Sequence, residues 1–216
     1  MITKLEKALA RLRRILPLKQ RQAECGEEVR ALHQEILRSF VTRGRILTRE
    51  EMALRVSNPG VAVNVLSTTG MVLFSGTGDP VGAYPFTTEA REHKVLVNGY
   101  QVHAMCSLDA LAVSPMFGMK TKIDSRCRVT GEPVHILQSG MTIENPDEVG
   151  DLHVGIGWGA ADADTSCADS LCMEMIFLKD GKIARQWLAD DAENREIFAL
   201  SMAVEFAGRF FVPLMS

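Results

Sequence analysis

The segment Val102–Cys127 constrains the fold most, because it carries no Lys or Arg before Lys120. A run this poor in charge is typical of a buried element, and its apolar residues predict a buried helix over Leu108–Phe117. Cys106 and Asp109 stand three residues apart where this helix begins. One turn of helix brings positions i and i+3 onto the same face. The segment therefore predicts a thiol and a carboxyl group side by side where water is scarce.

This thiol and carboxyl pair suits soft-metal chemistry that also needs a proton. A thiol that loses its proton is a soft ligand, and apolar surroundings raise the pKa of a carboxyl group, so that it can hold a proton near neutrality. A second candidate thiol, Cys172, opens the predicted buried strand Leu171–Leu178. Taken singly, such cysteines are more often small buried hydrophobes, and such an aspartate more often caps a helix. The residue types alone leave both interpretations open.

Together these segments resemble the organomercurial (alkylmercury) lyase family. The resemblance rests on the following segments, taken in this order: Gly82–Thr87, Met105–Asp109, Cys127–Val134 and Cys172–Phe177. It implies an enzyme of mercury detoxification that cleaves carbon–mercury bonds by protonolysis, giving a hydrocarbon and Hg(II). It also implies an α+β fold.

The resemblance assigns catalytic roles to Cys106, Asp109 and Cys172. The two thiolates would hold mercury, the carboxyl group would supply the proton, and all three would line the site of Hg(II) as substrate and product. No organic cofactor is implied, but external low-molecular-weight thiols are, as is a mercuric reductase that accepts the Hg(II). The alternative is a non-catalytic Hg(II) or Cu(I) binding protein on the same scaffold. Asp109 distinguishes the two, because binding a soft metal needs no proton donor.

The sequence gives less evidence of a chemical role for the other three cysteines. Cys127 matches a family position regarded as structural, and Cys25 has no evident role. Cys167 departs from the family pattern. It is either a bystander, the interpretation the sequence favours, or a thiol that helps mercury enter or leave. A Cys–His nucleophile built from His103 and Cys106 is disfavoured, because no oxyanion hole can be located.

Charge and cysteine usage exclude other classes of partner. A net charge of −3 and a pI near 6.0 do not indicate binding to nucleic acid or to membranes. No apolar run approaches the ~20 residues of a spanning helix. Five irregularly spaced cysteines, behind a start that lacks the pattern of a secretory signal, predict a cytoplasmic protein.

Residues 1–80 are expected to form an N-terminal helical, winged-helix-like module that does not bind DNA. Leucines at helical spacing predict an amphipathic helix over residues 2–22, bent or ended by Pro17. Residues 27–57 predict two helices around a turn, the second begun by a capping box of Thr48 and Glu51. A strand at Val72–Phe74 follows.

Residues 81–216 are expected to form an α+β catalytic domain with antiparallel strands. Asn98-Gly99 predicts a hairpin turn between two of them. This turn connects the predicted strands His93–Val97 and Tyr100–Ala104. Further strands are predicted at Lys120–Val129 and Val134–Leu137. A closing amphipathic helix is predicted over Glu193–Phe211.

Overall fold

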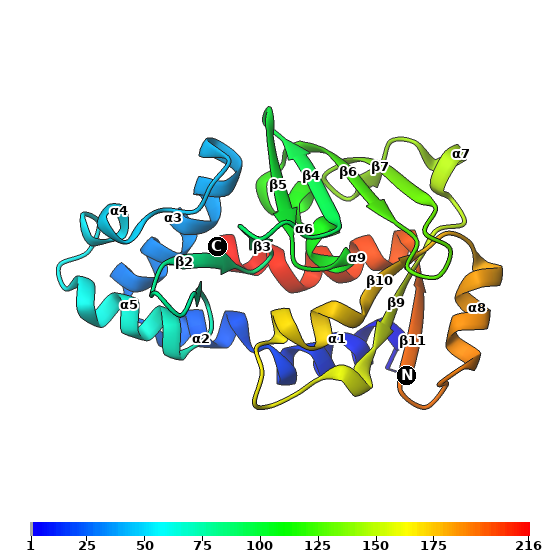
Figure 1. Cartoon of the computed structure of the whole chain (residues 1–216), viewed down its shortest axis with the longest axis horizontal. Coiled ribbons are helices and arrows are strands. Elements are labelled where there is room, and N and C mark those ends of the chain that lie inside the picture. Colours follow the sequence, from blue (N-terminus) through cyan, green and yellow to red (C-terminus); the bar gives the residue numbers. More distant parts are fainter. Residues whose placement is uncertain (1) are drawn as a thin grey trace.

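The computed structural model describes residues 2–216, which form helices packed against two antiparallel sheets (Figure 1). The larger sheet has the strand order β1-β2-β3-β5-β4-β6-β7-β8, and the smaller has the order β10-β9-β11. Every pair of neighbouring strands in these sheets is antiparallel. The predicted α+β class is therefore confirmed.

The strands are short, and most of them follow one another closely along the chain. Their bounds are β1 Leu73–Phe74, β2 Pro80–Ala83, β3 Phe86–Thr87, β4 His93–Val97, β5 Tyr100–Ala104, β6 Lys120–Arg126, β7 Pro133–Ser139, β8 Thr142–Ile143, β9 His153–Gly157, β10 Met175–Leu178 and β11 Arg195–Ala199. The bounds of the helices are α1 Lys4–Ile15, α2 Leu18–Glu24, α3 Glu27–Arg43, α4 Arg49–Ala53, α5 Pro59–Thr68, α6 Ser107–Phe117, α7 Pro146–Val149, α8 Gly181–Ala189 and α9 Leu200–Phe211.

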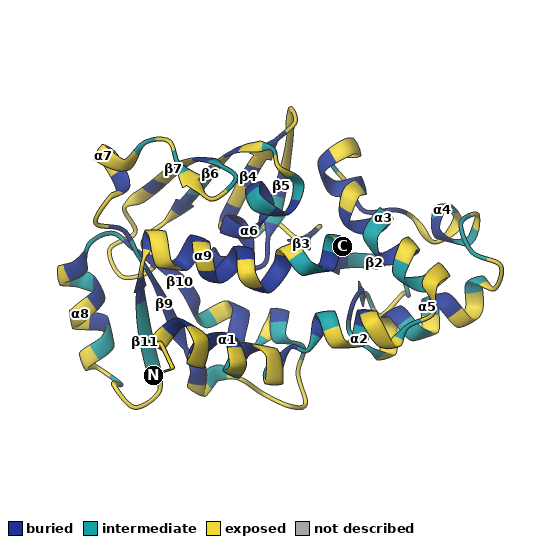
Figure 2. Ribbon diagram, turned by 180° about the vertical axis from the view of Figure 1, so that it is seen from behind, coloured by how far each residue is buried: buried dark blue, intermediate teal, exposed yellow. Residues whose placement is uncertain are grey.

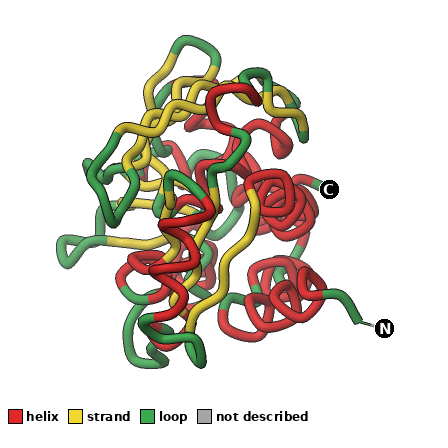
Figure 3. The backbone as a smooth tube through the Cα atoms, turned by 90° about the vertical axis from the view of Figure 1, so that its right-hand side faces the viewer, coloured by secondary structure: helices red, strands yellow, loops and turns green. Residues whose placement is uncertain are grey.

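The first helix is part of the core. α1 buries Leu5, Leu9 and Leu12, and it packs against α9 from the other end of the chain. Figure 2 shows buried and exposed residues alternating along both helices, and Figure 3 looks nearly along the two helices next to the labelled ends. Pro17 separates α1 from α2, as predicted. One hydrophobic core includes residues on both sides of residue 80, from Leu5 to Leu214. This shared core does not mark a boundary between two domains, and the division at residue 80 stays a prediction.

The segment after α2 has the predicted order of helix, turn and helix. Gly44 ends α3 in the left-handed conformation (φ 70°), and Thr48 begins α4 in a capping box with Glu51. α5 follows, and then β1 and β2 pair as neighbours at the edge of the larger sheet. Arg45 donates to Glu51 at 2.6 Å and Arg55 pairs with Glu35, so these cations are engaged within the protein.

The central element is α6, the buried helix predicted from the charge-poor segment. It packs against α9 on one side and against β4, β6 and β10 on others. Nearly all of its residues are buried, so it is apolar around its whole circumference rather than along one stripe. Gly118 ends it in the left-handed conformation (φ 64°), whereas Pro115 lies inside it.

The β4–β5 hairpin turns at Asn98-Gly99, where both residues have positive φ (49° and 81°), the requirement of a type I′ turn. The alternation of buried and exposed residues in β6 and β7 places one face of the larger sheet over α6. Among residues 2–216, no helix combines the length and the apolar character needed to cross a membrane.

Two predictions for the C-terminal third were correct only in part. The predicted strand Leu171–Leu178 is a 3₁₀ turn over Leu171–Glu174 followed by β10, so Cys172 precedes the strand rather than opening it. All four residues of β10 are buried, and both α6 and α8 pack against it, whereas only Leu171 and Cys172 of the turn are buried. The predicted helix Glu193–Phe211 begins only at Leu200, because Arg195–Ala199 pairs with β9 as strand β11. Pairing with a neighbouring strand here overrides the local helical pattern.

Candidate active site

The first turn of α6 holds the predicted thiol and carboxyl group. Cys106 is the N-cap of this helix, with an extended backbone (φ −151°), and its Sγ accepts a hydrogen bond from the backbone N–H of Asp109 at 3.4 Å. Ser, Thr, Asp and Asn normally fill this position, so here a thiol sulfur replaces the usual cap oxygen. Each of the two residues is only 1% exposed. The cap geometry explains why spacing i, i+3 brings them together.

Cys172 reaches the same place from the 3₁₀ turn before β10. Its Sγ lies 3.9 Å from Oδ2 of Asp109, although the two residues are 63 positions apart in the chain. The two sulfurs and one carboxylate oxygen of Cys106, Cys172 and Asp109 all lie within 4.8 Å of one another. The structure thus brings together the three residues that the sequence singled out, in an arrangement able to hold a soft metal ion.

Burial decides the protonation of this cluster. It raises the pKa of Asp109 from 3.8 to about 7 and that of Cys106 from 9.0 to about 12. The pKa of Cys172 is also raised, by hydrogen bonding with Cys106 and Cys167 and by burial. Near neutral pH both thiols keep their protons and Asp109 is close to its midpoint. The only charge on the cluster is then that of the partly ionised Asp109, until a metal ion displaces the thiol protons.

A cavity of about 620 Å³ leads to this cluster from the surface. Cys172 lines it together with two thioether side chains, Met105 and Met173. Charged residues, among them Arg91 and Arg128, line it as well. Cys106 and Asp109 are not among the described residues that line it. Cys172 is therefore the first of the three groups that a molecule in the cavity would contact.

The comparison with known proteins decides the family. The sequence model of alkylmercury lyase matches residues 86–212, which is more than half of the chain and includes the whole cluster. The chain belongs to the alkylmercury lyase family. The predicted membership in this family of lyases is confirmed.

Several proteins named alkylmercury lyase are similar to this chain over most of their length. Those of Bacillus cereus and Clostridium butyricum are each 27% identical over 188 residues, covering 85% of this chain and 82% of theirs. That of Pseudomonas putida is 25% identical over 162 residues, with 74% of each chain covered. The crystal structure of the mercury-bound form of MerB2 has a TM-score of 0.73 at 20% identity, and covers 92% of this chain and 98% of that chain. This last similarity shows that the fold is shared.

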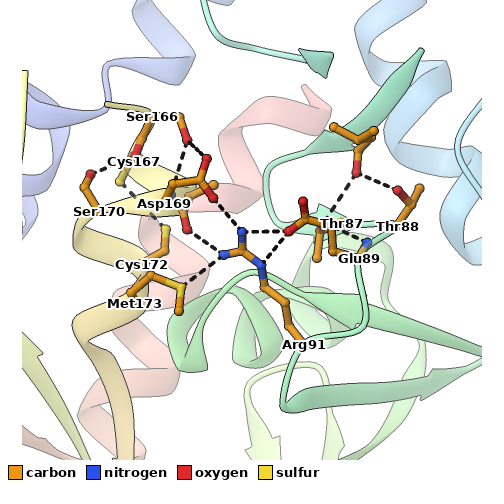
Figure 4. A network of polar contacts seen from close by, with 12 residues as sticks. Thr87, Thr88, Glu89, Arg91, Ser166, Cys167, Asp169, Ser170, Cys172 and Met173 are labelled. Atoms are coloured by element: carbon orange, nitrogen blue, oxygen red, sulfur yellow. Dashed lines mark hydrogen bonds and ion pairs between the residues drawn. The ribbon is translucent and has the colours of Figure 1, made fainter. Parts of the chain in front are cut away.

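The sequence of this alkylmercury lyase family member did not indicate three further residues at the site. Arg91 donates to the backbone oxygen of Ala168 at 2.5 Å and to Asp169 at 2.8 Å (Figure 4). The Tyr84 hydroxyl accepts from the N–H of Ala168 at 2.9 Å. Met175 places its Sδ 3.6 Å from Cys106 Sγ. Tyr84 lies in a segment that carries the family resemblance, whereas nothing in the sequence marks Arg91.

The other cysteines and His103 differ in where they lie and in what they contact. Cys25 donates to the backbone oxygen of Arg21 and takes no part in the cluster. Cys127 is buried and forms an isolated bridge with Phe177 at the end of the larger sheet. His103 bonds the backbone of Arg91 through Nδ1. Cys167, the departure from the family pattern, lies with its Sγ 3.7 Å from that of Cys172.

Proposed function

We propose that this protein cleaves carbon–mercury bonds by protonolysis, converting R–Hg(II) and a proton to R–H and Hg(II). The observation that supports this most strongly is the buried cluster of Cys106, Cys172 and Asp109. Two thiols supply the ligands that a soft cation prefers, and the carboxyl group beside them has a pKa of about 7. A group with this pKa can both accept and deliver a proton at neutral pH.

In the proposed sequence of steps, Cys172 binds the organomercurial first, because it lines the cavity. Its Sγ forms a bond to mercury as the thiol that carried the substrate leaves with the proton. Cys106 then binds, and ionised Asp109 accepts the Cys106 proton. Two thiolates donate electron density to mercury and make the bound carbon more basic. Asp109 delivers the proton to that carbon, the carbon–mercury bond breaks, and Hg(II) remains on the two sulfurs.

The proposal includes the setting that the family resemblance implies. Low-molecular-weight thiols carry the substrate to the cavity and remove the product, since the cluster is too deeply buried to release Hg(II) to water. A mercuric reductase accepts the Hg(II), and the pathway serves mercury detoxification in the cytoplasm. No organic cofactor takes part in the proposed steps.

The first test compares the wild-type protein with Asp109→Asn. Asn keeps the shape of the side chain and removes the acid. With excess thiol, the wild-type protein releases benzene from phenylmercury. The variant binds Hg(II) stoichiometrically but loses at least about two orders of magnitude in benzene release, the usual contribution of a positioned acid.

Near-normal turnover in Asp109→Asn would remove this residue from the mechanism. A wild-type protein that binds Hg(II) tightly but releases no benzene or methane would refute the proposed activity, and would leave a soft-metal binding protein on the same scaffold.

A further inference from the structure

Cys172 belongs to two groups of thiols at once. It belongs to the buried cluster with Asp109 and Cys106. Its Sγ also lies 3.7 Å from Cys167 Sγ (Figure 4). The mechanism proposed above uses only the first group. Cys106 and Cys172 are buried, whereas Cys167 is partly exposed. The chain therefore has a thiol within reach of the site that is closer to solvent than the two proposed ligands.

Hydrogen bonds on both sides of the peptide chain hold Cys167 in this place. The N–H of the next residue, Ala168, donates to the Tyr84 hydroxyl, and its carbonyl accepts from Arg91. Arg91 also pairs with Asp169 at 2.8 Å and with Glu89 at 2.9 Å (Figure 4). Side chains from the segment before β4 thus fix the loop that carries Cys167 beside Cys172.

We propose that Cys167 and Cys172 form a second, outer Hg(II) position, to which the metal passes after the hydrocarbon has left. The proposal rests on the proposed function for the origin of the Hg(II). Its geometry depends only on the two sulfurs and on the contacts of Cys172 with both Cys106 and Cys167. Hg(II) prefers thiolates strongly, so a third thiol at this distance from a bound Hg(II) competes for it.

The transfer is a ligand exchange without oxidation or reduction. A mercury–sulfur bond to Cys167 forms, and the bond to Cys106 breaks. The proton leaves the Cys167 thiol and passes to the Cys106 thiolate, so the charge of the cluster does not change. Mercury remains bound to Cys172 throughout. The exchange moves Hg(II) away from Asp109 and toward the more exposed thiol, where an external thiol can attack it.

The two thiols of the proposed outer position differ in their relation to the cavity. Cys172 lines the cavity, but Cys167 is not among its described lining residues. A substrate that enters through the cavity therefore contacts Cys172 first, and the outer position pairs this thiol with one that does not line the cavity.

The test uses the full-length chain and mercuric chloride, with no cleavage step. Cys106→Ser removes the inner position and is expected to retain one Hg(II) per chain, as a two-thiolate complex, during dialysis against a competing monothiol. Adding Cys167→Ser is expected to weaken this retention by more than about 100-fold, beyond the effect of losing an outer-shell partner. Adding Cys25→Ser instead is the matched control and should change nothing. Equal retention in the Cys106→Ser protein with and without Cys167→Ser would overturn the proposal.

A second measurement needs no change at Cys167. In the Cys106→Ser protein, one equivalent of Hg(II) is expected to protect Cys167 from alkylation by iodoacetamide, as followed by mass spectrometry of the peptide. Unchanged alkylation of Cys167 would overturn the proposal. If the wild-type protein released no benzene from phenylmercury, the proposed function would fail, while these two binding experiments would still report on the outer position.

Discussion

Replacing Asp109 by Asn should stabilise the protein, and the gain should grow with pH. Burial raises the pKa of this carboxyl group from 3.8 to about 7, so the folded protein binds its proton more tightly than the unfolded chain does. A group of this kind contributes most favourably below the unfolded pKa, and stability is lost as the pH rises from there to the folded pKa. Asn carries no proton to lose, so the variant lacks this pH dependence.

The size of the effect follows from the shift. A shift of about three units, at about 1.36 kcal/mol per unit, makes ionised Asp109 cost the folded state about 4 kcal/mol. At about pH 5 the unfolded chain has lost this proton and the folded protein has kept it, so the cost is then about 2 kcal/mol. The free energy of unfolding of Asp109→Asn, relative to wild type, should therefore rise by about 2 to 3 kcal/mol between about pH 5 and pH 8.

Urea denaturation of both proteins at several pH values in this range measures the difference. Other titrating groups are common to the two proteins, so their contributions largely cancel in the comparison. A difference that stayed constant to within about 0.5 kcal/mol would refute the reasoning, because it would mean that Asp109 ionises as easily in the folded protein as in the unfolded chain. The expected rise, together with the expected loss of benzene release, would show that the proposed proton donor lowers the stability of the folded protein.

Further predictions concern the core, the Cys167 loop and the remote thiol. Leu9→Ala should lower the free energy of unfolding by about 2 to 5 kcal/mol, measured in urea, since α1 is part of the core; a negligible loss would mean that α1 is detached. Tyr84→Phe leaves the Ala168 N–H without its acceptor and should cost about 1 to 3 kcal/mol, with faster hydrogen exchange at that amide; unchanged exchange would contradict the contact. Cys25→Ser should keep phenylmercury turnover within about twofold of wild type, and a larger loss would give this thiol a role.

Local patterns predicted most of the elements correctly. The helix ends at Thr48 and Gly44 and the turn at Asn98-Gly99 follow from backbone chemistry within a few residues, so the sequence contains what is needed. The predictions failed where contacts with residues distant in the chain determine the local structure. β11 exists because β9 offers it a pairing edge, and the pattern of Arg195–Ala199 alone does not reveal this.

For the candidate site, the sequence by itself determined the relation between Cys106 and Asp109, because one helical turn fixes two residues at spacing i, i+3. It also determined that the surrounding segment is apolar, which indicated the direction of the Asp109 pKa shift. Only the tertiary structure decided that Cys172 completes the cluster and that Cys167 lies against it. The contact between Cys172 and Asp109 joins residues 63 positions apart, and it depends on how β10, which follows the turn of Cys172, packs against α6. No local pattern encodes that packing.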